Sequence, residues 1–340
     1  MNKVDVAAVD GPAVAELPPA IQIRGLVKCY GDVEAVRGID LDVLPGETFG
    51  FLGPNGAGKS TTIKILCTLA VATSGTARVA GWDVATDPVA VRRQIGLVFQ
   101  EPTLDAYLTG EQNLRFHGEL YGVDRSGAAA RREEVLRMVG LWERRGDEVQ
   151  TYSGGMRRRL EIARGLLHSP KVLFLDEPTI GLDPQTRASI WDYLRALHHS
   201  EEITVFVTTH YMDEAENCDR IAIINEGRIV ALDTPDRLKA AVGKDRVQIT
   251  TEDDDTAIRA LRERFDLDAA VHEGMVSFAV IDGAAFVPRL FTELGVPIRS
   301  VTVTRPSLDD VFLAHTGTTI RDAEKSGRGI NPLAFLARGR

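Results

Sequence analysis

A glycine-rich run constrains the fold of this chain more than any other segment. Residues 53–61 read Gly-Pro-Asn-Gly-Ala-Gly-Lys-Ser-Thr, between a buried-type apolar stretch, Thr48 to Leu52, and a helical pattern, Lys59 to Leu69. Glycine allows the backbone angles that turn successive N–H groups inward, and a following helix adds the positive end of its dipole. We therefore predict a strand, a phosphate-binding loop and a helix.

Side chains in this loop complete the predicted phosphate site. Lys59 reaches the β- and γ-phosphates as a point charge, and Ser60 offers a hydroxyl to Mg²⁺. The other predicted contacts of the loop are Gly53, Asn55, Gly56, Gly58 and Thr61. The alternative is a glycine-rich turn with a structural role only, which the flanking strand and helix disfavour.

A second turn, Ser153-Gly154-Gly155, precedes a helical run from Met156 to Leu167. The tripeptide alone is a weak signal, but its position at a helix start favours an anion site. The two turns cannot serve one another. If they hold opposite sides of a nucleotide, one protomer supplies half a site and a second protomer supplies the rest.

The apolar pattern predicts an α/β core. Residues 172–175 and 204–207 are continuous apolar runs, as in strands covered on both faces of a parallel sheet, and residues 185–198 between them have helical spacing. Residues 21–23 and 39–43 are short apolar stretches, the second with a period of two, so we expect antiparallel strands there.

Polar residues directly follow the predicted core strands. Because parallel sheets bind ligands at the carboxyl ends of their strands, we expect Asp176 to hold Mg²⁺ and Glu177 to accept a proton from an attacking water. His210 is predicted to bond the γ-phosphate or this water, and Gln100 to contact Mg²⁺. The alternatives are acidic residues that open a loop, a structural histidine and a polar strand cap.

Composition limits the partners. A formal charge of −9 disfavours a non-specific nucleic-acid binder, so no nucleic-acid partner is expected. The arginine pairs or runs at 131–132, 144–145 and 157–159 are predicted to be solvated helix faces. No window approaches the roughly 18 apolar residues of a membrane span, and any work at a membrane is therefore expected to need a partner.

Cysteine usage predicts a reducing compartment. Cys29, Cys67 and Cys218 lie far apart and show no metal-ligand spacing, so no structural zinc is expected.

The 340 residues are too many for one compact core, and the pattern changes near Gly243. The later part has the order β-α-β-β-α-β of a ferredoxin-like α+β sandwich, with a last helix opened by Ser307. The predicted units are a disordered lead (1–19), a nucleotide-binding domain (20–240) with a helical subdomain (about 101–167), an accessory or regulatory domain (244–317) and a flexible tail (318–340).

Taken in order, these residues resemble an ATP-binding-cassette (ABC) ATPase, over about residues 21–233. The resemblance implies a P-loop NTPase fold with antiparallel and helical subdomains. It assigns Tyr30 as the aromatic residue that stacks on adenine and His210 as the switch histidine. The motifs that it assigns between them are Walker A (53–61), the Q-loop (Gln100), the signature (152–156), Walker B (172–177) and the D-loop (Gly181 to Asp183).

The signature differs from the commonest Leu-Ser-Gly-Gly-Gln at Tyr152 and Met156. With Arg157-Arg-Arg-Leu after it, and with Ser307-Leu-Asp-Asp-Val-Phe-Leu-Ala-His-Thr-Gly317 near the end, the chain resembles the daunorubicin-resistance-type branch of the family.

This resemblance implies a head-to-tail dimer with ATP and Mg²⁺ at each interface. One protomer supplies the residues around Lys59 and Glu177, and the other supplies Ser153 and Gly155. The implied function is the ATP-hydrolysing subunit of an exporter, peripheral on the cytoplasmic face of the membrane, that moves a drug-like or lipophilic compound through a separate permease. The apolar residues after Gln100 are expected either to seat a permease helix or to be subdomain core: Pro102, Leu104, Tyr107 and Leu108.

Three other functions stay open at this point. A soluble ABC ATPase acting on ribosomes or DNA is disfavoured by the single cassette and the lack of sustained heptads. A regulator without turnover is disfavoured by the presence of both Glu177 and His210. An exporter of another substrate, such as a polysaccharide or lipid, is the third alternative, because an ABC ATPase contacts nucleotide and permease and not the transported molecule.

Overall fold

The structure is a computed structural model that describes residues 18–317 and 320, except 125, 202 and 273. The predicted disordered lead and flexible tail fall almost wholly outside the described residues and stay predictions.

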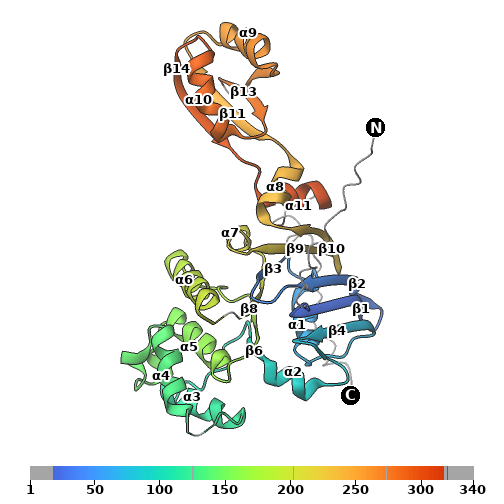
Figure 1. Cartoon of the computed structure of the whole chain (residues 1–340), viewed down its shortest axis with the longest axis vertical. Coiled ribbons are helices and arrows are strands. Elements are labelled where there is room, and N and C mark those ends of the chain that lie inside the picture. The colour runs from blue at the N-terminus through green and yellow to red at the C-terminus, as the bar shows by residue number, and fades with distance from the viewer. Residues whose placement is uncertain (1–17, 125, 202, 273, 318–319, 321–340) are drawn as a thin grey trace, which may run out of the picture.

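A six-stranded sheet forms the centre of the first unit (Figure 1). Its strands, in spatial order, are β10 (Arg228–Asp233), β9 (Arg220–Asn225), β3 (Thr48–Leu52), β8 (Thr204–Thr209), β7 (Val172–Asp176) and β6 (Ile95–Val98). All neighbours run parallel except β10 and β9. Every residue of β3, β7 and β8 is buried, which confirms the buried parallel strands expected from the continuous apolar runs.

Side chains alternate between two apolar cores on the two faces of this sheet. Phe49, Phe174 and Phe206 face the core shared with an antiparallel sheet, whereas Leu173 and Val205 face the core shared with the helical subdomain. The antiparallel sheet consists, in spatial order, of β2 (Val33–Val43), β1 (Ile21–Tyr30), β4 (Ser74–Val79) and β5 (Trp82–Asp83). This pairing confirms the antiparallel strands predicted around residues 21–23 and 39–43.

Helices complete both sides of the first unit. They are α1 (Lys59–Leu66), α2 (Pro88–Gln94), α6 (Pro184–Glu201), α7 (Met212–Ala215) and α8 (Pro235–Val242). Helix α1 ends three residues before the predicted Leu69, because Thr68 takes a left-handed conformation with φ of 62°.

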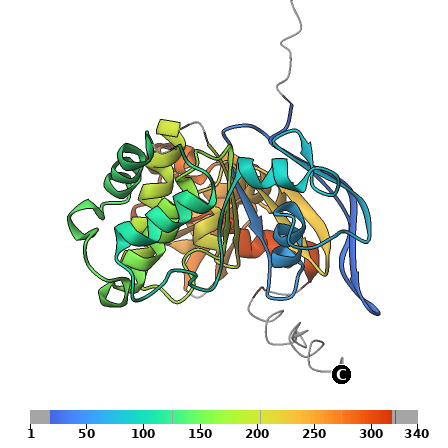
Figure 2. The same ribbon diagram turned by 90° about the horizontal axis from the view of Figure 1, so that it is seen from below.

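The helical subdomain lies on the side of the central sheet opposite the antiparallel sheet (Figure 2). It consists of α3 (Gly110–Leu120), α4 (Ala128–Met138), the 3₁₀ turns η1 (Trp142–Arg144) and η2 (Val149–Thr151), and α5 (Gly154–Leu166). The described residues of 101–167 include no strand, as expected. Thr109 and Gln112 form a capping box that begins α3.

The later unit has the predicted β-α-β-β-α-β order. Its elements are β11 (Asp245–Thr251), α9 (Asp254–Phe265), β12 (Ala269–His272), β13 (Met275–Val280), α10 (Gly283–Glu293) and β14 (Ile298–Thr304). The strands form an antiparallel sheet in the order β12-β13-β11-β14, which has its own apolar core.

The last helix, α11 (Leu308–Thr316), departs from the expected division of the chain. Ser307 caps it as predicted, through a capping box with Asp310. However, its buried residues Leu308, Val311 and Phe312 join the apolar core of the first unit, and the helix packs on α8 (Figure 1). The helix therefore belongs by its packing to the first unit, although the sequence pattern placed it in the accessory domain.

Candidate active site

The predicted catalytic residues lie at one edge of the central sheet. The glycine-rich loop, Gln100, Glu177 and His210 come at or just after the ends of β3, β6, β7 and β8, respectively. These four strands are parallel, so their carboxyl ends share this edge.

The glycine-rich loop folds tightly against the chain around it. Gly58, which precedes α1, has φ of 109°, and a Cβ atom there would lie 2.6 Å from the Ala35 carbonyl oxygen. Only glycine fits both restrictions. The Lys59 side chain is 4% exposed, and its ammonium donates hydrogen bonds to the carbonyls of Gly53 and Pro54, at 2.7 and 3.0 Å. Asn55 and Gly56 lie exposed at the tip of the loop.

Three side chains converge on the carboxylate of Glu177. Lys59 Nζ lies 3.3 Å and His210 Nδ1 3.5 Å from Oε1, and Gln100 Nε2 lies 3.5 Å from Oε2. Burial alone raises the pKa of Glu177, but the contacts with His210 and Lys59 outweigh it and lower this pKa below its ordinary value. The carboxylate is therefore ionised and able to accept a proton.

The backbone of Glu177 adopts a conformation that only surrounding contacts can hold. Its φ is 46°, in the left-handed region that residues other than glycine rarely adopt. Its N–H donates to the carbonyl and the hydroxyl oxygen of Thr208 on β8, at 3.2 and 3.0 Å. Thr208 escaped the sequence analysis, since it reads only as one more residue of a buried strand.

Asp176 and Ser60 bring two side-chain oxygen atoms together beside Glu177. The Ser60 hydroxyl donates to Asp176 Oδ1 at 3.2 Å, and the Thr208 hydroxyl donates to the same oxygen at 2.6 Å. One carboxylate and one hydroxyl, completed by phosphate and water oxygens, suit Mg²⁺, which prefers few protein ligands. The residues present therefore fit the predicted ion.

The second turn lies apart from the first within one chain. The Ser153 side chain accepts the N–H of Met156 at 3.2 Å and caps α5. A Cβ on Gly155 would lie 2.4 Å from Thr186 Cγ2, and Asp183 accepts the N–H and hydroxyl of Thr186 at 2.9 and 2.6 Å. The predicted signature and the predicted D-loop are thus linked through Thr186, while α1 and α5 occupy separate parts of the fold (Figure 1).

Tyr30 ends β1 with a ring that is 43% exposed. The Lys28 ammonium lies 4.7 Å from the ring centroid, at cation–π distance. An exposed ring held from one side offers a surface on which a planar base can stack.

The prediction that residues 157–159 form a solvated helix face is wrong for Arg158. This side chain is only 7% exposed. A buried charge is expected to be paired, and the partner of Arg158 is Glu161 at 2.8 Å. Sequence reasoning missed both residues; an acidic residue three positions after an arginine was the available signal.

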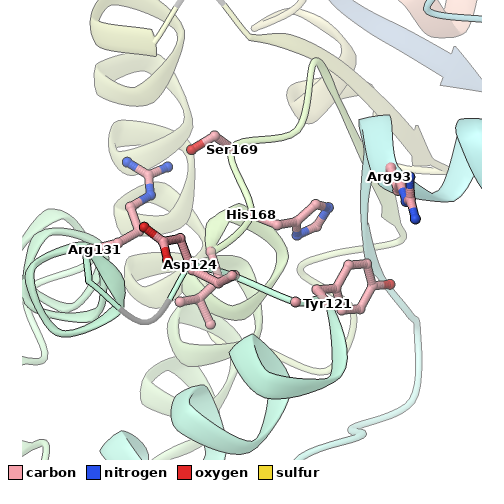
Figure 3. Close-up of a pocket in the computed structure, with 10 residues that line it drawn as sticks. Arg93, Tyr121, Asp124, Arg131, His168 and Ser169 are labelled. Carbon is pink, nitrogen blue, oxygen red and sulfur yellow. The ribbon is translucent and has the colours of Figure 1, made fainter.

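A separate pocket of about 640 Å³ lies between α2, α4 and the segments that follow α3 and α5 (Figure 3). Arg93, Tyr121, Arg131 and His168 are among its lining residues, and the His168 and Tyr121 rings stack with centroids 4.4 Å apart. None of its lining residues belongs to the predicted nucleotide site.

Comparison with known proteins identifies the family of the chain. The family profile described as "ABC transporter" matches residues 36–180, and that of the "ATP-binding protein DrrA1-3-like, C-terminal domain" matches residues 234–316. The daunorubicin/doxorubicin resistance ATP-binding protein DrrA of Streptomyces peucetius is 43% identical, over 88% of this chain and 92% of that protein. The linearmycin resistance ATP-binding protein LnrL of Bacillus subtilis (strain 168) is 37% identical, over 89% and 100%.

Solved structures give the same fold. CbiO1 from Clostridium perfringens, part of the transporter complex cbiONQ, superposes with a TM-score of 0.62 at 26% identity, over 74% of this chain and 97% of that one. The ATP-binding cassette MJ0796, in a dimeric post-hydrolysis state with ADP and Pi, gives 0.57 at 27%, over 63% and 98%. The fold and site define an ATP-hydrolysing cassette of a transporter. The chain belongs to the ABC transporter ATP-binding family, with a C-terminal domain of the DrrA1-3 type.

Proposed function

We propose that this chain is the ATP-hydrolysing subunit of an exporter that moves a drug-like or lipophilic compound through a separate membrane permease. The convergence of Lys59, Gln100 and His210 on Glu177 carries the catalytic part of the proposal. The resistance functions in the names of its relatives support the direction and the class of cargo. Among the described helices, none is long and apolar enough to span a membrane.

In the proposed reaction, Glu177 accepts a proton from the water that attacks the γ-phosphate. A phosphate in the loop competes with Glu177 for the Lys59 ammonium, which lies 3.3 Å from the carboxylate. Ser60 and Asp176 would hold Mg²⁺, which would supply positive charge for the phosphate oxygens.

The second half of the proposed site comes from another copy of the chain in a head-to-tail dimer. Ser153 and Gly155 begin α5, and the N-terminus of this helix is suited to the γ-phosphate of the partner's ATP. The separation of α5 from the glycine-rich loop within one chain supports this arrangement (Figure 1). Asp183 bonds Thr186, which packs against Gly155, so in this dimer Asp183 also lies at the interface.

A groove on the helical subdomain is the proposed seat for the permease. Its volume is about 380 Å³, and Leu108, Phe116 and Leu120 line it. Phe116 and Leu120 are 60% and 66% exposed, as is Tyr107 of the preceding loop at 78%. Leu104 instead packs against the apolar core, which favours the subdomain-core alternative for that residue. The proposed location is therefore peripheral, on the cytoplasmic face of the membrane.

The groove gives the experiment that tests the proposed function. Co-expression with each permease encoded beside the gene, followed by membrane fractionation, should recover the wild-type chain with the membranes. Phe116→Asp should move it to the soluble fraction, because a charge cannot lie against an apolar helix without a large desolvation cost.

Phe291→Asp is the matched control, since Phe291 is 55% exposed but lies on α10 of the C-terminal domain. It should stay with the membranes. A wild-type chain that remains soluble with every candidate permease contradicts the transporter function and favours a soluble ABC ATPase.

Tyr30→Ala should raise the KM for ATP about 10-fold with little change in kcat, since base stacking on an aromatic ring is worth about 1–3 kcal/mol. Tyr30→Phe keeps the ring and should behave as wild type. Steady-state ATPase kinetics check both variants, and an unchanged KM for Tyr30→Ala would remove Tyr30 from the adenine site.

A further inference from the structure

Arg158 on α5 joins three segments that lie far apart in the sequence. Its guanidinium donates to the carbonyl of Phe99, the residue before Gln100, and to the carbonyls of Pro178 and Glu177, the latter at 3.0 Å. A fourth contact reaches the carbonyl of Asp176 at 3.5 Å. A guanidinium has five donors in a fixed planar fork, so it can bind these four carbonyls and a carboxylate at once, whereas an ammonium has only three donors.

Glu161, one turn further along α5, fixes this guanidinium. It accepts Arg158 Nη1 at 2.8 Å through one oxygen, and through the other the backbone N–H of Thr103 at 2.8 Å. Arg164 adds a bond to the Thr103 carbonyl at 3.3 Å. Glu161 is 2% exposed, so the pair is buried, and helix α5 holds the loop on both sides of Gln100, at Phe99 and at Thr103.

We propose that Arg158, fixed by Glu161, is a positioning residue for hydrolysis. It couples the position of helix α5 to the backbone of Glu177 and to the loop that carries Gln100. Glu177 has a left-handed φ of 46°, which costs free energy and needs contacts to persist. Thr208 holds its N–H, and Arg158 holds its carbonyl and both neighbouring carbonyls.

The coupling rests on the proposed function and describes how dimer closure would affect the catalytic carboxylate. Helix α5 begins at the signature turn, which is proposed to face the partner's nucleotide. A displacement of α5 when the dimer closes therefore moves the backbone that aims the Glu177 carboxylate, without Arg158 touching ATP.

Arg158→Lys tests this coupling, since lysine keeps the charge beside Glu161 but loses the fork that binds several carbonyls. We expect kcat to fall about 100-fold, while the KM for ATP changes less than about three-fold, because the misplaced group is the base and not the nucleotide-binding loop. The ATP-bound dimer should still form in size-exclusion chromatography.

Arg159→Lys is the matched control. Arg159 is the next residue of α5, and it donates to the Val139 carbonyl and the Tyr193 hydroxyl, at 3.0 and 2.9 Å, away from the catalytic edge. Its kcat should stay near that of the wild type.

Should Arg158→Lys fail to fold, the double variant Arg158→Gln/Glu161→Gln removes both buried charges together and decides in its place. A folded variant at position 158 with the kcat of Arg159→Lys overturns the coupling. A wild-type chain without ATPase activity overturns the proposed function instead, so the two failures are distinct.

Discussion

Glu177→Gln should lower kcat by about 10²- to 10⁴-fold, the usual contribution of a general base. Glutamine keeps the size of the side chain and leaves the backbone contacts with Thr208 in place, but it cannot accept the proton of the attacking water. Because the nucleotide-binding loop is intact, ATP should stay bound and hold two copies together. Size-exclusion chromatography with ATP should therefore show a dimer that persists, and an ATPase assay should show the loss of turnover.

Glu226→Gln is a suitable control for the unusual backbone at this position. Glu226 also has φ of 46°, but it lies in the exposed turn between β9 and β10. A loss of turnover in both variants would point to backbone strain instead of proton transfer. An ATP-loaded Glu177→Gln chain that elutes as a monomer would contradict the shared site.

Lys59→Ala should lower kcat/KM for ATP by at least about 10²- to 10³-fold, the effect of removing one donor that stabilises developing charge. The ammonium is buried at the head of α1, where it binds two loop carbonyls and Glu177. Without it, the phosphates lose their nearest positive charge, and the pKa of Glu177 rises toward the value that burial favours. Nucleotide titration measures the loss of ATP binding, and steady-state kinetics measure the loss of kcat/KM.

Lys64→Ala removes an exposed lysine from the same helix and should leave both measurements unchanged. Tight ATP binding with normal turnover in Lys59→Ala would exclude the glycine-rich loop as the phosphate site.

The catalytic edge of the sheet could be predicted because each of its residues follows an apolar run. Such runs define buried parallel strands, and parallel strands end at a common edge, so Asp176, Glu177 and His210 had to meet there. Their mutual contacts with Lys59 follow from the loop after β3. The order of motifs along the chain was sufficient for this part of the site.

Arg158 could not be placed in this way. Successive residues of a helix point about 100° apart, so a run of three arginines spreads over most of its circumference, and the rotation of α5 decides which one is buried. That rotation is set by packing against the sheet and α6, which no local pattern records. Thr208 was missed for a related reason. It lies in a strand that reads as core, so the sequence pattern gave no sign that its hydroxyl contacts the site.

The return of α11 to the first unit changes how the C-terminal domain is attached. Residues 245–304 leave the nucleotide-binding unit after α8 and rejoin it at α11, so the domain is an insertion with two anchored ends and not a pendant on one linker. Two anchors limit its rotation, and a truncation after residue 240 would also remove Leu308, Val311 and Phe312 from the core beside Leu238. The role of this domain is therefore best studied by excising its sheet and joining α8 directly to α11, which keeps the nucleotide-binding unit whole.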